Sequence, residues 1–381
     1  MHEIVKLDRA RSREALDLSM YAFQYKVDER DLAEKIESYG SQDIYGILAE
    51  DELAAKMHLL SFEVWLQGKK VKMGGIASVA TYPEHRRSGM VDALLKKGLQ
   101  EMKGNGQVIS YLHPFKISFY RRYGWEVFSD VKKVEIPAEE LKPLPAVPGS
   151  IKRYEKGELS AAGRIYEKFA LKFGGMLVRS REWWEKSVLG QYTMAIYYDA
   201  DNEPQGYVLY KAGGRHLEVN EWVSLNHEAR QGLWNFFCQH DSMVEKAGII
   251  VPKDDPFPNF IANPRVKTEL YPYFMARIVD AERFLKLFSF NRVEKPVILH
   301  IKDSIAEWNN QSFVLKEEGA FLLHEAREGL TITISSLTAL LLGAQTAETL
   351  WEIGEISGTY EDMQNLKEAV PLIRPLFLDF F

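Results

Sequence analysis

Residues 75–90 read GIASVATYPEHRRSGM, and this stretch decides the fold of the chain. Small and apolar residues from 71 to 81 predict a buried strand, and the proline and glycine that follow predict a turn. Beyond the turn, apolar side chains recur at helical spacing and predict an amphipathic helix at residues 88–103: Val91, Leu94, Leu95, Leu99 and Met102. A strand, a glycine-bearing turn and a helix therefore follow one another.

The turn between Glu84 and Met90 has the chemistry of an anion site. Backbone N–H groups at a helix start have no partner within the helix and lie at its positive end, so they bind phosphate groups. Arg86 and Arg87 add charge, and Gly89 lets a ligand approach the backbone. The glycine patterns of dinucleotide folds and P-loops do not occur here, which argues against a dehydrogenase or an NTPase. A solvated basic turn that caps a helix explains the turn alone equally well.

Alternating helical and strand patterns surround this stretch up to about residue 145. They predict helices at residues 12–24 and 29–38, a helical turn at 117–123, and strands at 44–50, 53–66, 71–81, 108–112 and 126–136. Gln67-Gly68-Lys69, between two of the strands, predicts an antiparallel hairpin. The proline-rich segment 142–149 predicts a linker.

After the linker the pattern starts again. Val79-x4-Glu84-x-Arg86-x2-Gly89 recurs as Val223-x4-Glu228-x-Arg230-x-Gly232, with a helix expected at residues 234–246. We interpret this as an internal duplication of one α/β domain, with a chance match of a short pattern as the alternative. From about Asp280 the pattern changes to that of a third, α+β domain.

Composition limits the classes of function. The 381 residues are 46% hydrophobic and 27% charged, as in a globular protein of two or three domains. The net charge of −6 argues against nucleic-acid binding and suits cationic partners. The single cysteine, Cys238, excludes an internal disulfide, and the nine histidines lack the spacing of a metal site. No signal-peptide pattern opens the sequence and the apolar run 334–344 is too short to span a bilayer, so we expect a cytoplasmic protein without membrane contact.

The strand and turn resemble motif A of the GNAT acetyltransferase superfamily. The resemblance implies acetyl-CoA as co-substrate and no metal, with the pantetheine arm on the strand end and the pyrophosphate in the turn. The residues implied at this cofactor site are Val79, Ala80, Thr81, Arg86, Arg87, Ser88, Gly89 and Met90. Val91 stands where the motif has glycine or alanine, a departure expected to shift the helix start and leave the anion site intact.

The whole chain resembles the enhanced intracellular survival (Eis) family, through its two GNAT-like halves, its third domain, the segment 275–280 and its aromatic C-terminus. This resemblance implies an α/β and α+β architecture. Tandem GNAT-like domains are expected at residues 1–145 and 146–280, and a sterol-carrier-protein-like domain at residues 281–381. A homohexamer is also implied. The second half has one arginine, Arg230, where the first has a pair, so we expect a degenerate copy that does not bind acetyl-CoA.

Direct transfer of acetyl to an amine needs a base for the amine and an acid for the departing thiolate. The family resemblance implies Tyr120 as the general acid. Tyr123 is the nearest rival, and core packing is the alternative role of either tyrosine. The resemblance also implies the terminal carboxylate of Phe381 as the general base. A chain end that is apolar to its last residue suggests docking, which makes a carboxylate more basic, but anchoring of the chain by Phe380 and Phe381 is the simpler role.

The resulting hypothesis is an N-acetyltransferase that acts on an amine of an aminoglycoside, a polyamine or a lysine side chain. Asp28, Glu29 and Asp31 are candidates for holding such a cation, with helix-cap charges as the alternative. Two other functions stay open at this point. One is a Fem-type aminoacyl transferase on a tandem GNAT fold, and the other is a non-catalytic protein that binds a lipid or another hydrophobic ligand.

Overall fold

The structure is a computed structural model that describes residues 2–40, 42–154, 158–316 and 318–381. Within these residues one twelve-stranded sheet has the order β1-β2-β3-β4-β5-β12-β6-β11-β10-β9-β8-β7. Its strands are β1 (Ile4–Lys6), β2 (Asp43–Ala49), β3 (Glu52–Leu66), β4 (Lys69–Thr81), β5 (Ile109–Leu112), β6 (Glu126–Pro137), β7 (Ser150–Tyr154), β8 (Thr193–Tyr198), β9 (Pro204–Gly213), β10 (His216–Ser224), β11 (Lys246–Pro252) and β12 (Lys267–Ile278).

The first half has the elements that its sequence predicts. Helices α1 (Ser12–Phe23) and α2 (Glu29–Gly40) precede the hairpin of β3 and β4. Gln67 and Gly68 form the two-residue hairpin loop, with φ angles of 49° and 74°. Positive φ at both loop positions matches the right-handed twist of paired strands, which explains why glycine stands there.

Helix α3 (Met90–Gly104) carries the chain from β4 to β5, which run parallel. Its buried face includes Leu94, Leu95, Leu99 and Met102, as the spacing predicts. In the second half, α7 (His227–Cys238) connects the parallel strands β10 and β11 in the same way. The repeated strand–helix–strand unit confirms the internal duplication. Helices α5 (Leu159–Ala170), α6 (Arg181–Trp183) and α8 (Phe257–Phe260) complete this half.

The helix predicted at residues 234–246 is wrong at both ends. α7 already begins at His227, because the side chain of Asn226 accepts a hydrogen bond from the N–H of Ala229 and caps the helix there. It ends at Cys238, and Lys246 opens β11 instead, with Ala247, Ile249 and Val251 buried at alternate positions.

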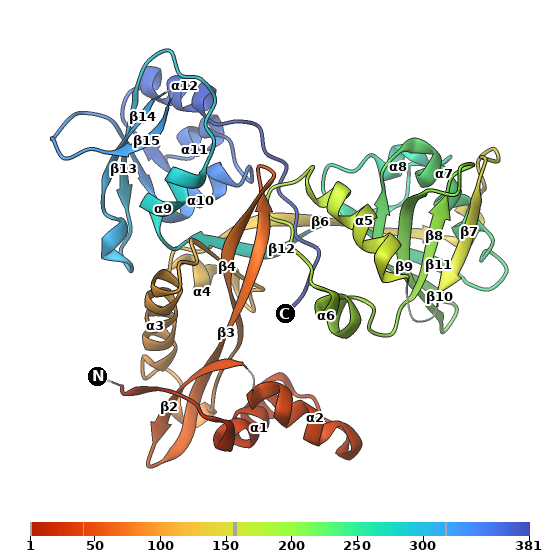
Figure 1. The fold of residues 1–381 in the computed structure, drawn as a ribbon, viewed down its shortest axis with the longest axis horizontal. Coiled ribbons are helices and arrows are strands. Elements are labelled where there is room, and N and C mark those ends of the chain that lie inside the picture. The colour runs from red at the N-terminus through yellow and green to blue at the C-terminus, as the bar shows by residue number, and fades with distance from the viewer. Residues whose placement is uncertain (1, 41, 155–157, 317) are drawn as a thin grey trace.

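The two halves share their central strands. β12, from the end of the second half, lies between β5 and β6 of the first, while β6 pairs with β11 of the second. Figure 1 shows β6 and β12 crossing the middle of the molecule. The sheet is therefore continuous through both halves. Sequence patterns did not predict β12, because most of Lys267–Tyr271 is exposed polar sequence without alternation.

The third domain contains a five-stranded sheet in the order β15-β14-β13-β16-β17. Its elements within the described residues are β13 (Val297–Lys302), β14 (Ser312–Lys316), β15 (Gly319–Leu322), β16 (Leu330–Thr333), β17 (Ile356–Ser357), α9 (Ala281–Leu287), α10 (Ile334–Leu341), α11 (Ala347–Glu352) and α12 (Tyr360–Ala369). It packs on the first half, with which it shares a hydrophobic core.

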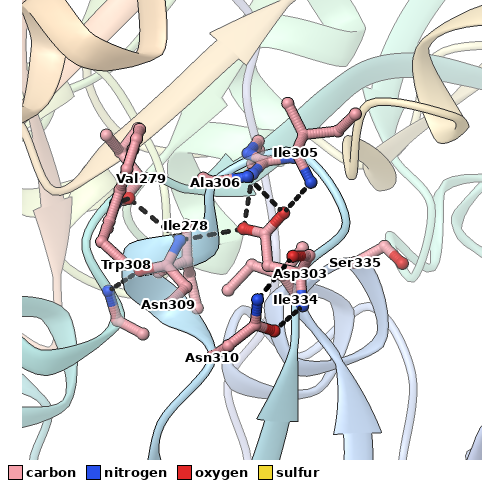
Figure 2. Close-up of polar contacts among 12 residues, drawn as sticks. Ile278, Val279, Asp303, Ile305, Ala306, Trp308, Asn309, Asn310, Ile334 and Ser335 are labelled. Atoms are coloured by element: carbon pink, nitrogen blue, oxygen red, sulfur yellow. Dashed lines mark hydrogen bonds and ion pairs between the residues drawn. The ribbon is translucent and has the colours of Figure 1, made fainter. Parts of the chain in front are cut away.

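A buried ion pair joins this domain to β12. Arg277 donates to Asp303 at 2.6 Å, and both side chains are almost fully buried. Figure 2 shows the Asp303 carboxylate accepting from the N–H groups of Ile305 and Ala306 and from the Asn309 amide. These hydrogen bonds offset the desolvation of the Asp303 carboxylate, whereas Nε and Nη1 of Arg277 are buried without a hydrogen-bond partner among the described residues.

After α12 the chain crosses back to the junction of the two GNAT-like halves. The N–H of Leu376 donates to Gly174 of the second half, and the N–H of Phe377 donates to Ser129 of the shared strand β6. The C-terminus ends near α6, in the middle of the molecule (Figure 1). The last residues of the third domain thus lie against both other domains.

Candidate active site

The basic turn between β4 and α3 is exposed. A short 3-10 turn, Pro83–His85, leads to Arg86, Arg87, Ser88 and Gly89, all of them exposed. Gly89 has a φ of 84°, and none of the described side chains caps the start of α3. A Cβ built on Gly89 meets no atom within 4 Å, so a ligand can reach the N–H groups of the turn. This geometry can bind a phosphate group.

Strands β4 and β5 separate at their C-terminal ends. Their parallel pairing runs from Met73 to Ile76 and stops with Leu112, whereas β4 continues to Thr81 along β3 alone. On that side of residues 77–81, none of the described strands uses the backbone N–H and C=O groups. A free strand edge can hold an amide-bearing chain by strand-like hydrogen bonds. Val79, Ala80 and Thr81 belong to this edge.

Tyr120 lies on α4 (Ile117–Arg121), directly after the end of β5. It is 3% exposed and packs in the core of the first half with Met90, the first residue of α3, and with Trp125. Burial raises the pKa of the Tyr120 phenol. Burial and the nearby Asp92 carboxylate raise the pKa of Tyr123 as well. Both phenols are therefore protonated at neutral pH, which is the form that can donate a proton.

A cavity of about 1380 Å³ lies between the two GNAT-like halves. Its wall comes from α2, β3 and β4 on one side and from residues 177–187 on the other, and the last two residues of the chain complete it. Ala77 and Ser78, at the start of the free edge of β4, belong to this wall. Strand β4 thus lines the cavity and also provides the free edge beside α3.

Carboxylates outnumber ammonium groups on the described cavity wall. The carboxylates are Asp31, Glu34, Glu37, Glu63 and Glu182, and the ammonium groups are Lys35, Lys72 and Lys186. Asp28 and Glu29 do not line the cavity, and Asp28 pairs with Arg30 instead. Asp31, one of the sequence candidates, does line it, and Glu34 and Glu37 could have been found with it, since residues three apart on a helix share a face.

Phe381 lies in this cavity with its ring against β4. The ring meets Phe62 and Phe274 at centroid distances of 5.0 and 5.3 Å. A Cβ built on Gly75 would come within 2.7 Å of Cε2 of Phe381, so only glycine leaves room for the ring. Phe380 is 61% exposed and touches His113, whose pKa is lowered by burial and by the charge of Lys133.

A buried polar cluster lies on β3 beside the cavity. Lys56 donates to His58 Nε2 at 2.7 Å and to Ser78 Oγ at 2.8 Å, and His58 Nδ1 donates to Gln42 at 2.6 Å. Burial lowers the pKa of Lys56. Burial, and then the charge of Lys56, lowers the pKa of His58, which is therefore neutral at pH 7. Sequence analysis missed this pair, although two polar residues at alternate positions of an apolar strand were visible.

The turn of the second half is occupied by its own side chains. Asn226 caps α7, and Arg230 forms a bidentate pair with Asp255 at 2.7 and 2.8 Å. The Glu228 carboxylate accepts from the hydroxyl of Tyr197 at 2.6 Å. The arginines of the first turn are exposed and none of the described carboxylates pairs with them, whereas Arg230 of the second turn is held by Asp255. This arrangement suits a copy without cofactor binding, which stays a prediction.

Among the described residues, no group of three or more His, Cys, Asp or Glu side chains is arranged to hold a metal ion. No helix in the described part of the chain is long and apolar enough to cross a membrane.

Comparison with known families separates the chain into three matched regions. An acetyltransferase (GNAT) domain model matches residues 3–128, and a second acetyltransferase (GNAT) domain model matches residues 175–278. A sterol carrier protein domain model matches residues 281–378. Both halves of the large sheet are therefore GNAT domains, as the internal repeat predicts.

Similar proteins occur among curated proteins and solved structures. An uncharacterized N-acetyltransferase of Streptomyces avermitilis is 24% identical over 331 residues, which are 80% of this chain and 79% of that one. N-acetyltransferase Eis of Mycobacterium tuberculosis is 25% identical over 209 residues, about half of each chain. A probable N-acyltransferase from Enterococcus faecalis superposes over 100% of both chains with a TM-score of 0.93 and 27% identity. Eis1 from Mycobacterium abscessus shares the fold, with a TM-score of 0.82, 20% identity and full coverage of both chains.

The order of the matched domains and the named relatives agree with the geometry of the exposed turn and the free strand edge. The chain belongs to the GNAT N-acetyltransferases, as a tandem-GNAT enzyme of the Eis family with a C-terminal sterol carrier protein domain.

Proposed function

We propose that this enzyme transfers acetyl from acetyl-CoA directly to an amine of a polycationic small molecule or a lysine side chain. One observation supports the proposal most. The terminal ring packs on Gly75 of β4, the strand whose far end forms the free edge and leads into the basic turn. Strand β4 therefore contacts the end of the chain at Gly75 and provides the free edge for the cofactor at residues 79–81.

The residues of the first half fit acetyl-CoA. Arg86, Arg87 and the uncapped start of α3 suit a pyrophosphate, which carries two negative charges or more. The free edge at Val79–Thr81 suits the two amides of a pantetheine arm. When bound, acetyl-CoA supplies the reactive acetyl thioester.

The two proton transfers are assigned to residues of this chain. The carboxylate of Phe381, whose ring lies against Phe62 in the cavity, takes a proton from the acceptor ammonium or amine. The Tyr120 hydroxyl, kept protonated by burial, gives a proton to the departing sulfur. The deprotonated Tyr120 regains its proton when products leave.

Acceptor class follows from the charge of the cavity wall. Five carboxylates and three ammonium groups line it; Glu37 is paired with Arg9 and Glu182 with Lys186, which leaves Asp31, Glu34 and Glu63 to attract a ligand with several amines. Phe62, Trp183 and Phe381 add flat apolar surface for the carbon skeleton of the ligand. Aminoglycosides, polyamines and lysine-bearing peptides all satisfy these conditions.

Binding and turnover are tested with purified protein. Acetyl-CoA should raise the melting temperature, and thiol release followed with a disulfide dye should require an added amine from a panel of an aminoglycoside, spermidine and a lysine peptide. Stabilisation by acetyl-CoA with amine-dependent thiol release supports the proposal. Absence of stabilisation by acetyl-CoA contradicts it, and so does thiol release at the same rate with and without the amine.

A further inference from the structure

Three buried charged groups tie the end of the chain to the second GNAT domain. Arg179 donates from Nε to Asp379 at 2.8 Å and from Nη1 and Nη2 to Glu221 at 2.9 and 2.5 Å. Each of the three side chains is at most 3% exposed. Asp379 lies two residues from the C-terminus, whereas the other two belong to the second half.

Aromatic groups complete this cluster. The indole N–H of Trp183 donates to Asp379 at 2.8 Å, and the hydroxyl of Tyr207 donates to Glu221. The Arg179 guanidinium lies 3.9 Å from the ring centroid of Tyr166. Every charged member therefore has both an ionic and a neutral partner, which is the condition under which buried charges are tolerated.

The cluster occupies a part of the second half that is a ligand wall in the first. When Val223 is matched to Val79, Glu221 corresponds to Ala77, which lines the cavity. Both positions adjoin a register shift between neighbouring strands. The second copy thus presents a carboxylate where the first presents a cavity wall, and Arg179 joins that carboxylate to Asp379 of the C-terminal segment.

The charges are not balanced within the cluster. Arg179 is already paired bidentately with Glu221, so the ion pair of the second half does not depend on Asp379. Burial raises the pKa of Asp379, and Glu221 adds to this, while Arg179 opposes it. Burying a second carboxylate here costs folding free energy. In return, the Arg179–Asp379 ion pair holds the C-terminal segment in one place.

That fixed point determines where the chain can end. Two residues after Asp379 extend the backbone by about 7 Å at most. The Phe381 ring is held separately by Phe62, Phe274 and the space above Gly75. Two restraints so close together leave the terminal carboxylate little freedom within the cavity.

We propose that Asp379, held by Arg179, is a positioning residue that sets the place of the terminal carboxylate in the cavity, and that the second GNAT domain serves as a socket for the tail. This inference rests on the proposed role of Phe381 as general base. The first test of the inference does not measure activity, so the inference and the proposed role of Phe381 can fail separately.

The first test is the rate at which carboxypeptidase removes Phe381 and Phe380 from the native protein, followed by intact mass. Asp379→Asn should release them at least about 10-fold faster than wild type, because a charge-assisted hydrogen bond is lost. Glu221→Gln keeps the Arg179–Asp379 pair and should stay protected. Arg374→Ala is the matched control in the same tail, because its ion pair with Asp254 is about half exposed and worth little.

The result for Glu221→Gln separates the two roles of the cluster. If the cluster only stabilises the second half, Asp379→Asn and Glu221→Gln expose the tail equally, and the inference is overturned. Release from Asp379→Asn at the wild-type rate overturns it too. Melting curves of all variants identify any general loss of folding.

The second test is steady-state kinetics. Asp379→Asn should lower kcat by about 10- to 100-fold, with an unchanged KM for acetyl-CoA, because a misplaced base slows the chemical step alone. Unchanged kcat with a loosened tail would show that anchoring has no part in positioning the base. If wild type itself shows no turnover, the proposed function fails, and the carboxypeptidase result still decides whether Asp379 anchors the tail.

Discussion

Gly75→Ala adds one methyl group where the terminal ring meets the cofactor strand. A Cβ at this position lies 2.7 Å from Cε2 of Phe381 and 3.0 Å from Cε2 of Phe62. Ordinary contact begins at 3.4 Å, so the Phe381 ring must move by about 0.7 Å. The methyl group cannot avoid this contact by bending β4, because β4 is paired on both sides at Gly75.

We expect a displacement of this size to have a small effect on folding free energy and a large effect on the rate of catalysis. Overpacking costs about 1–3 kcal/mol of folding free energy, and the half-buried ring at the end of the chain can yield, so we expect the low end of this range. A shift of the reacting groups by about 1 Å costs up to about 100-fold in rate. We therefore expect kcat to fall about 10- to 100-fold and KM for acetyl-CoA to change less than about 2-fold.

The assay compares kcat, KM and melting temperature of Gly75→Ala with those of Gly98→Ala. In the control the new Cβ also meets a neighbour at 2.7 Å, but that neighbour is Cε of Met57, the mobile end of a flexible side chain under α3. Gly98→Ala should keep wild-type kcat. Wild-type kcat in Gly75→Ala, with the added methyl group tolerated, would refute the view that the place of the Phe381 ring matters to the reaction.

Three further predictions concern other parts of the site. Arg86→Ala combined with Arg87→Ala should raise the KM for acetyl-CoA by about 10- to 100-fold, since charge-assisted bonds to phosphate are lost; unchanged KM in initial-rate assays would move the pyrophosphate elsewhere. Tyr120→Phe should lower kcat about 100-fold or more at an unchanged melting temperature, and a fully active variant would point to Tyr123. Because the folded-state pKa of His58 is below its unfolded value, its stabilising contribution is present above about pH 6.5 and is lost as the pH falls, by up to about 1.4 kcal/mol per pH unit. Denaturant unfolding of wild type and His58→Gln between pH 7.5 and about pH 5.5 should show a smaller pH dependence in the variant, and parallel curves would contradict the assignment.

The sequence predicted those parts of the fold that depend on local pattern. The β3–β4 hairpin, α3 and the repeated unit around α7 follow from periodicity and turn residues, because each element buries one face. β12 escaped prediction, since its place between β5 and β6 is set by strands far away in the chain. The wrong bounds of the helix predicted at 234–246, where α7 covers His227–Cys238, came from reading residues of two elements as one.

The candidate site likewise has parts that the sequence could predict and parts that only the fold brings together. The basic turn was visible because its residues are contiguous, whereas the cavity wall combines α2, β3, residues 177–187 and the tail. The role of Asp379 depends on Arg179, a residue about half the chain away, and spacing alone cannot bring such a pair together. Lys56 and His58 did leave a signal in the sequence, as polar side chains on one face of an apolar strand.

Replacing the terminal carboxylate with an amide removes the proposed general base and leaves the rest of the chain unchanged. Protein ligation can supply an otherwise unchanged chain whose last residue, Phe381, carries a carboxamide and keeps its ring. We expect kcat to fall by about 100-fold or more, within the range for loss of a general base, with unchanged stabilisation by acetyl-CoA. Wild-type turnover by the amidated enzyme would contradict the proposed role of Phe381 as general base.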